Sequence, residues 1–229
     1  MREDMRTMSE EGFQFIGKMT ASVTHEIKNV LAVIRENAGL MEDLIAMGER
    51  KGGVDPARIQ SLAEKIGKQA MKADDIVQNM NRFAHSMDDF VTDVDLGKAL
   101  DLLAALSGRL AIVRGVTLQT RLPDAPVWIK TYPIFLETLL WGCLDFAMDK
   151  AREDKQLGIT VAQTKKEFVQ IRIAGIDAAD LCASGFSLER CEAIRRILGA
   201  EMELTSAGDE IVIDLPRQVQ VQEAPLSRE

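Results

Sequence analysis

The chain of 229 residues is poor in aromatic residues and has only two histidines. Phe, Trp and Tyr make up 5% of it, so Leu, Ile, Val, Met and Ala must fill the core, which suits helix packing better than a β-sandwich. No apolar run reaches the ~18 residues that a membrane span needs, and no signal peptide is recognised. We therefore expect neither a membrane span nor a membrane partner.

Charge and cysteine content exclude further classes. The net charge is −8 without a dense Lys/Arg stripe, which argues against nucleic acid as a ligand. The odd set of Cys143, Cys182 and Cys191 has no CxxC spacing, so we interpret these residues as buried thiols in a reducing cytoplasm. The two histidines, His25 and His85, are too far apart in the sequence to suggest a zinc site.

The first part of the chain has the pattern of two long amphipathic helices. Apolar residues recur at steps of three, four and seven from Phe13 to about Ala46, whereas the polar residues 1–12 are expected to fray. A second periodic run follows, for which Asp55 is the expected N-cap and Pro56 the first helical residue. One αα-hairpin cannot bury both apolar stripes, so we expect two hairpins to pair as a four-helix bundle in a homodimer. This helical-hairpin domain is assigned to residues 1–92.

The second part mixes helical and alternating patterns, and short strands bounded by turn residues predominate. The patterns predict helices at 96–113, 133–151 and 186–198, and strands at 116–121, 127–129, 159–164, 168–174, 202–205 and 211–215. This order predicts a two-layer α/β sandwich over residues 93–217, and thus an α+β fold for the chain. Residues 218–229 are expected to form a disordered tail.

One short motif in the first helix carries chemistry. Since an α-helix turns by about 100° per residue, His25 lies about 200° from Val23 of the apolar stripe and points toward solvent. A neutral imidazole is a good nucleophile near pH 7 and forms covalent intermediates. Glu26 could accept a hydrogen bond from one ring nitrogen, and Asn29, one turn on, could orient a water or a phosphoryl oxygen. On geometry alone, a plain solvated histidine remains the alternative.

The residues around His25 are small, so a partner could approach the imidazole closely. We identify Ala21, Ser22, Lys28 and Ala32 as candidate partner-binding residues. For the two alanines, ordinary helix formers on a surface are the alternative. The second histidine, near the end of the second helix, is expected to be solvated or to cap that helix.

The segment Gly17–Asn29 closely resembles the H-box of two-component sensor histidine kinases, with Val30 where that pattern usually has proline. The resemblance implies that His25 is the phospho-accepting histidine and Glu26 its acid/base partner. Glu26 and Asn29 also match an arrangement that serves dephosphorylation of a partner receiver. Residues 77–84 resemble the second dimerisation helix of the family, and the α/β part is more weakly similar to its ATP-binding domain.

The nucleotide-binding elements of that family are altered in this sequence. Asp145, in the segment 139–145, stands where the family has an asparagine that binds magnesium on ATP. Residues 174–180 lack the glycine spacing of the adenine-reading segment, and Ser184–Leu188 is a remnant of the glycine box that follows a long lid. Phosphate cradles need exposed backbone N–H groups and glycines. We therefore expect no intrinsic cofactor and no ATP binding, with Mg²⁺ supplied by a receiver partner.

The resemblance implies a degenerate kinase core acting as a histidine phosphotransferase-type phosphorelay protein. His25 would carry phosphate between the receiver aspartates of response regulators, and an upstream hybrid histidine kinase is a further candidate partner. One alternative is an active or divergent cytoplasmic histidine kinase that autophosphorylates from ATP. Another is a non-catalytic scaffold that binds response regulators. Receiver phosphatase activity through Glu26 and Asn29 is compatible with the first hypothesis, and enzymatic activity itself stays open.

Overall fold

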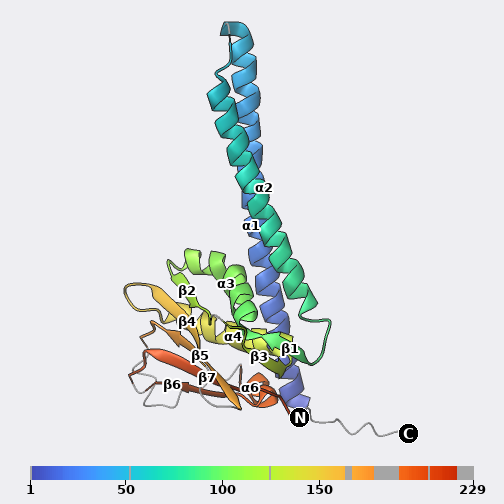
Figure 1. Ribbon diagram of the computed structural model, residues 1–229, viewed down its shortest axis with the longest axis vertical. Helices are drawn as coiled ribbons and strands as arrows, with labels where there is room; N and C mark the ends of the chain where they lie inside the picture. The colour runs from blue at the N-terminus through green and yellow to red at the C-terminus, as the bar shows by residue number, and fades with distance from the viewer. Residues whose placement is uncertain are drawn as a thin grey trace, which may run out of the picture.

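Two long antiparallel helices stand on an α/β unit in the computed structural model, which describes residues 2–51, 53–123, 125–162, 167–177, 191–205 and 207–220 (Figure 1). The hairpin consists of α1 (Arg2–Lys51) and α2 (Pro56–His85). The elements that follow are β1 (Thr92–Asp95), α3 (Leu96–Val113), β2 (Thr117–Arg121), β3 (Trp128–Thr131), α4 (Pro133–Asp149), β4 (Gln156–Ala162), β5 (Phe168–Ala174), α6 (Glu192–Leu198), β6 (Glu201–Leu204) and β7 (Glu210–Pro216). The α+β fold is therefore confirmed. None of the helices in these ranges is both long and apolar enough to cross a membrane.

The hairpin follows the sequence signals closely, except at its start. Asp55 caps α2 by accepting a hydrogen bond from the backbone N–H of Ala57 at 3.0 Å, and Pro56 opens the helix, as predicted. The predicted fraying of residues 1–12 is wrong, because α1 already begins at Arg2. Its early turns, around Glu11, face α6 and are supported by that contact.

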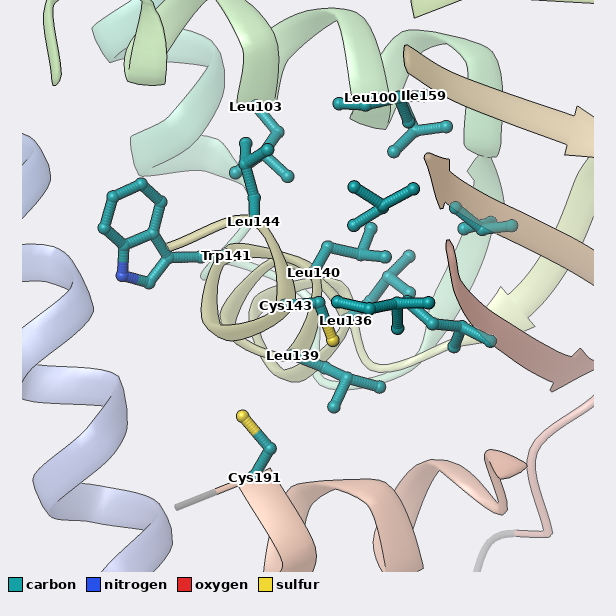
Figure 2. Packing of buried hydrophobic residues seen from close by; sticks show 14 of the residues in the cluster. Leu100, Leu103, Leu136, Leu139, Leu140, Trp141, Cys143, Leu144, Ile159 and Cys191 are labelled. Carbon is teal, nitrogen blue, oxygen red and sulfur yellow. The ribbon is translucent and has the colours of Figure 1, made fainter. Parts of the chain in front are cut away.

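The α/β unit is built on a five-stranded sheet with the strand order β2-β4-β5-β7-β6. The pair β2–β4 is parallel and the other pairs are antiparallel. Leu157 and Ile159 of β4 are buried against the helical layer, whereas Gln156 is exposed, as a half-buried strand requires. Figure 2 shows α4 in the middle of this layer, with Leu136 and Leu140 on its side toward the strands.

A second, two-stranded sheet was not expected from the sequence. Its strand β1, in an acid-rich stretch of the sequence, pairs antiparallel with β3. Asp95 is buried and accepts a hydrogen bond from the backbone N–H of Gly97 at 3.0 Å, so it caps α3. The acid thus has a structural role.

The end of the chain also departs from the prediction. The backbone N–H of Lys130 donates to the carbonyl of Arg217 at 2.8 Å, and the N–H of Val219 donates to the carbonyl of Lys130 at 2.9 Å. Val219 is buried. The tail predicted to be disordered from residue 218 therefore continues along β3 at its first residues, and residues 221–229 lie outside the described part of the chain.

Hairpin and α/β unit share one hydrophobic core. Phe15 of α1 packs edge-on against Phe83 of α2, with ring centroids 5.2 Å apart, and stacks against Trp141 of α4 at 6.1 Å. Phe15 and Phe83 are almost completely buried. The lower part of α1 is therefore enclosed between α2 and α4, and the core runs across the boundary at residue 92 that the pattern change suggests.

A buried acid lies where α2 ends against α4. Glu137 is 6% exposed, and its Oε2 lies 2.8 Å from Ser86 Oγ, which is also 2.7 Å from the carbonyl oxygen of Phe83. Burial raises the pKa of Glu137 from 4.5 to about 7, against the opposing effects of the Ser86 hydrogen bond and the charge of Arg82. A protonated Glu137 can donate a hydrogen bond to Ser86 Oγ while the Ser86 hydroxyl donates to the carbonyl oxygen of Phe83. In the neutral form of the acid, both hydroxyl protons therefore have an acceptor.

This acid should make stability depend on pH. Between pH 4.5 and about 7 the folded state keeps a proton that the unfolded chain has released, so stability falls by up to about 3 kcal/mol as pH rises through this window. Glu137→Gln keeps the shape and a donor for Ser86. In urea unfolding it should be more stable than the wild type at pH 8 and nearly equal to it at pH 5. The exposed Glu203→Gln is the control, and an equal effect of Glu137→Gln at both pH values would contradict the prediction.

Candidate functional site

His25 lies on an open face of α1. The neighbouring stripe of Met19, Val23 and Val30 is buried, which turns the opposite side of the helix, with His25 and Asn29, toward solvent. Within the part of the chain that the structure describes, no hydrogen bond or ion pair engages the imidazole. The ring is therefore accessible to a reacting partner, as the helix geometry predicts.

Glu26 contacts the second helix of the hairpin. Its carboxylate forms an ion pair with Lys72 of α2 at 2.9 Å, and it does not bond to the imidazole of His25 in this arrangement. Because the Lys72 side chain is half exposed, such a pair contributes at most about 1 kcal/mol and holds Glu26 only weakly. Lys72 could not be found from the sequence, because it lies off the apolar stripe of α2 and no local motif marks it.

The structure separates the four predicted partner-binding residues. Ala21, Lys28 and Ala32 are exposed, as a docking role requires. Ser22 is 3% exposed, which excludes it from a docking surface. It lies one turn beyond Lys18, which contacts Asp145 of the α/β unit, and the periodicity of the hairpin alone gives no sign of this burial.

The position that the family resemblance assigns to magnesium is filled by an ion-pair network. Asp145 of α4 is nearly buried, and its Oδ1 accepts a hydrogen bond from Arg114 Nη2 at 2.8 Å, while its Oδ2 accepts one from Lys18 Nζ at 3.2 Å. Arg114 Nε also lies 3.3 Å from Asp149 Oδ1. The Lys18 ammonium is 5.7 Å from the ring centroid of Trp141. Two carboxylates and two cations thus balance each other between α1, α3 and α4.

This network leaves no place for a divalent cation. Burial alone would raise the pKa of Asp145, but the hydrogen bond from Arg114 and the positive charges of Lys18 and Arg114 outweigh it and lower the pKa. The acid is therefore ionised, with a cation already on each oxygen. Magnesium needs several oxygen ligands at about 2.1 Å and would have to displace both. The residues at this position do not fit a magnesium ion.

A glycine in the same segment serves packing. A Cβ atom at Gly142 would collide with the sulfur of Cys191, at the start of α6. Figure 2 shows Cys191 directly below α4, and Trp141 on the side of α4 toward α1. The other altered nucleotide elements, Ala178–Asp180 and Ser184–Leu188, lie outside the described residues, as does Cys182.

The second histidine has a local partner. His85, the last residue of α2, lies 2.7 Å from Asp88 through Nδ1 and Oδ2. This arrangement agrees with the local role that the sequence predicts for His85.

No protein-family model matches the sequence, and no curated protein matches it. Among solved structures, the chain is similar to the catalytic domain of histidine kinase ThkA, with a TM-score of 0.48 and 14% identity over 56% of this chain and 96% of that one. It is also similar to a bacterial phosphotransferase (TM-score 0.47, 13% identity, 88% and 95% covered) and to the histidine kinase AdeS of Acinetobacter baumannii (0.43, 13%, 87% and 98%).

The packing role of Gly142 can be tested directly. Gly142→Ala should lower the free energy of unfolding by about 1–3 kcal/mol, because the added methyl group must push α6 away from α4. The control is Gly108→Ala in α3, where a Cβ meets nothing within 4 Å and a gain of roughly 0.5–1 kcal/mol is expected. Urea unfolding measures both. Equal stability of the two variants would show that α6 does not approach α4 this closely.

Proposed function

We propose that the chain is a histidine phosphotransferase of two-component signalling, with His25 as the phosphate carrier. The observation that supports this most directly is the engagement of both Asp145 oxygens by Lys18 and Arg114, beside a histidine that stays exposed. A chain that keeps the acceptor but fills the magnesium position must be loaded by another protein. The partners are receiver domains of response regulators, phosphorylated by an upstream hybrid histidine kinase.

The transfer needs few groups from this chain. The unprotonated ring nitrogen of His25 attacks the phosphorus of a receiver's aspartyl phosphate, a P–N bond forms, and the P–O bond to the aspartate breaks, releasing the carboxylate. The Mg²⁺ of the receiver neutralises the phosphoryl oxygens throughout. Asn29 donates to a phosphoryl oxygen, and Glu26, released from Lys72, accepts the N–H of the other ring nitrogen. The reverse sequence hands the phosphoryl group to a second receiver.

The alternatives make different demands on the same residues. A kinase would need magnesium at Asp145, against the two cations held there. A pure scaffold would have no use for an exposed histidine with an amide one turn on. Receiver phosphatase activity is a second function favoured by the exposure of Asn29, whose amide could hold the attacking water.

We further propose a homodimer in the cytoplasm. Leu31 and Ile45 of α1 and Val77 of α2 are 43–53% exposed although they are apolar, so a second hairpin could cover them in a four-helix bundle. Cys143 is a buried free thiol, which suits a reducing compartment.

Phosphate labelling tests the proposed function. With radiolabelled ATP and Mg²⁺ alone the protein should stay unlabelled, and calorimetry should show no binding of ATP. A labelled phospho-receiver should transfer its phosphate to an acid-labile, base-stable site. His25→Gln should abolish this labelling and His85→Gln should leave it intact. Labelling by ATP alone would establish the kinase alternative instead, and labelling that survives His25→Gln would move the site.

The docking face can be tested by adding bulk near His25. Ala32 lies two turns beyond the histidine on the same face, so Ala32→Arg should slow transfer from a phospho-receiver at least tenfold, a loss of about 1.4 kcal/mol or more. Ala46→Arg is the matched control, because it is exposed on the same helix about 30 Å from His25. Urea unfolding should show that both variants fold. Equal transfer rates for the two would remove this face from the docking surface.

A further inference from the structure

The α/β unit contacts α1 through α3, α4 and α6, and several of these contacts lie within one helical turn. Phe15 stacks on Trp141, and Lys18 both lies over the same ring and pairs with Asp145. From the other side, Arg114 at the end of α3 engages the second oxygen of Asp145. One side of α4, including the position that the family resemblance assigns to magnesium, is thereby covered by the protein's own first helix.

These contacts favour one orientation of the α/β unit relative to α1 over other orientations. Asp145 is only 7% exposed and ionised, and a buried carboxylate that loses a cation is strongly disfavoured. If the α/β unit turned away from α1, Asp145 would lose Lys18, and Trp141 would lose both the Phe15 ring and the ammonium. Because the Lys18 side chain is itself 44% exposed, the ion pair adds little to the free energy of unfolding. Its main effect is to select one orientation of the α/β unit relative to α1.

The contact of Lys18 with the α/β unit lies close to His25, the proposed phosphate carrier. Lys18 precedes His25 by seven residues, which places it about 10 Å lower along α1 and within about 20° around the helix axis. Ser22, which lies between them in the sequence, is buried as well. The α/β unit therefore occupies the space below His25, toward the N-terminus of α1, on the side of the helix that carries the histidine.

We infer that Lys18 and Asp145 are positioning residues that hold the α/β unit in one fixed orientation against α1, which we call the lock. The α/β unit then restricts the direction from which a receiver approaches the imidazole of His25. The lock is inferred from the contacts alone, whereas its effect on receiver approach rests on the proposed phosphotransfer.

Distance measurements test the lock. Spin labels at Glu42→Cys on α1 and Thr117→Cys on β2, in a Cys182→Ser background and diluted with unlabelled protein, report the arrangement by pulsed electron paramagnetic resonance. The parent protein and Lys18→Arg, which keeps the charge, should give one narrow distance distribution. Lys18→Met should broaden it, and the exposed Lys65→Met on α2 should not. A distribution as narrow in Lys18→Met as in the parent would overturn the lock.

Transfer kinetics test the effect on receiver approach. With a phospho-receiver as donor, Lys18→Met should raise the half-saturating receiver concentration several-fold while leaving the maximal rate, which His25 sets, nearly unchanged. Lys18→Arg should restore the parent value. A broadened distribution with unchanged kinetics would overturn the positioning role and leave the lock. If even the parent protein accepts no phosphate, the proposed function fails, and the distance distributions alone still decide the lock.

Discussion

A single carboxylate joins the helices on which this molecule is built. Asp145 of α4 holds Lys18 of α1 on one oxygen and Arg114, at the end of α3, on the other. If the hairpin left the α/β unit, Asp145 would keep Arg114 but lose Lys18, so the acid links the two parts through one of its two cations. The aromatic contacts of Phe15 with Phe83 and Trp141 lie within one helical turn of Lys18 and join the same parts.

Local patterns predict much of the fold, and they fail where distant segments meet. The helix at 96–113 and the strand at 168–174 agree with the structure to the residue, because their periodicity and flanking turns are contained in their own sequence. The ion pair of Lys18 depends on Asp145 of the α/β unit, which lies 127 positions away in the sequence. No periodicity in α1 reports such a partner. The pairing of Glu26 with Lys72 is hidden for the same reason.

The candidate site shows the same division. The exposure of His25, Asn29, Ala21 and Ala32 follows from the turn of an α-helix, and the structure agrees with it. The partners of Asp145 could not be predicted. The sequence shows an acid where the family has an amide, but it does not show which cations lie beside that acid. In the proposed relay, the chain supplies a nucleophile and a rigid frame, and the metal and the high-energy phosphate both come from receivers.

The coupling among Lys18, Arg114 and Asp145 also bears on how such a site can change during evolution. Replacement of Asp145 by asparagine alone would leave two cations facing each other without an acid, and the loss of either cation alone would leave a buried acid with one partner fewer. Residues in direct contact have strongly non-additive effects, so the effect of a change at one of these three positions depends on the other two. The network therefore restricts which substitutions the three positions can accept one at a time.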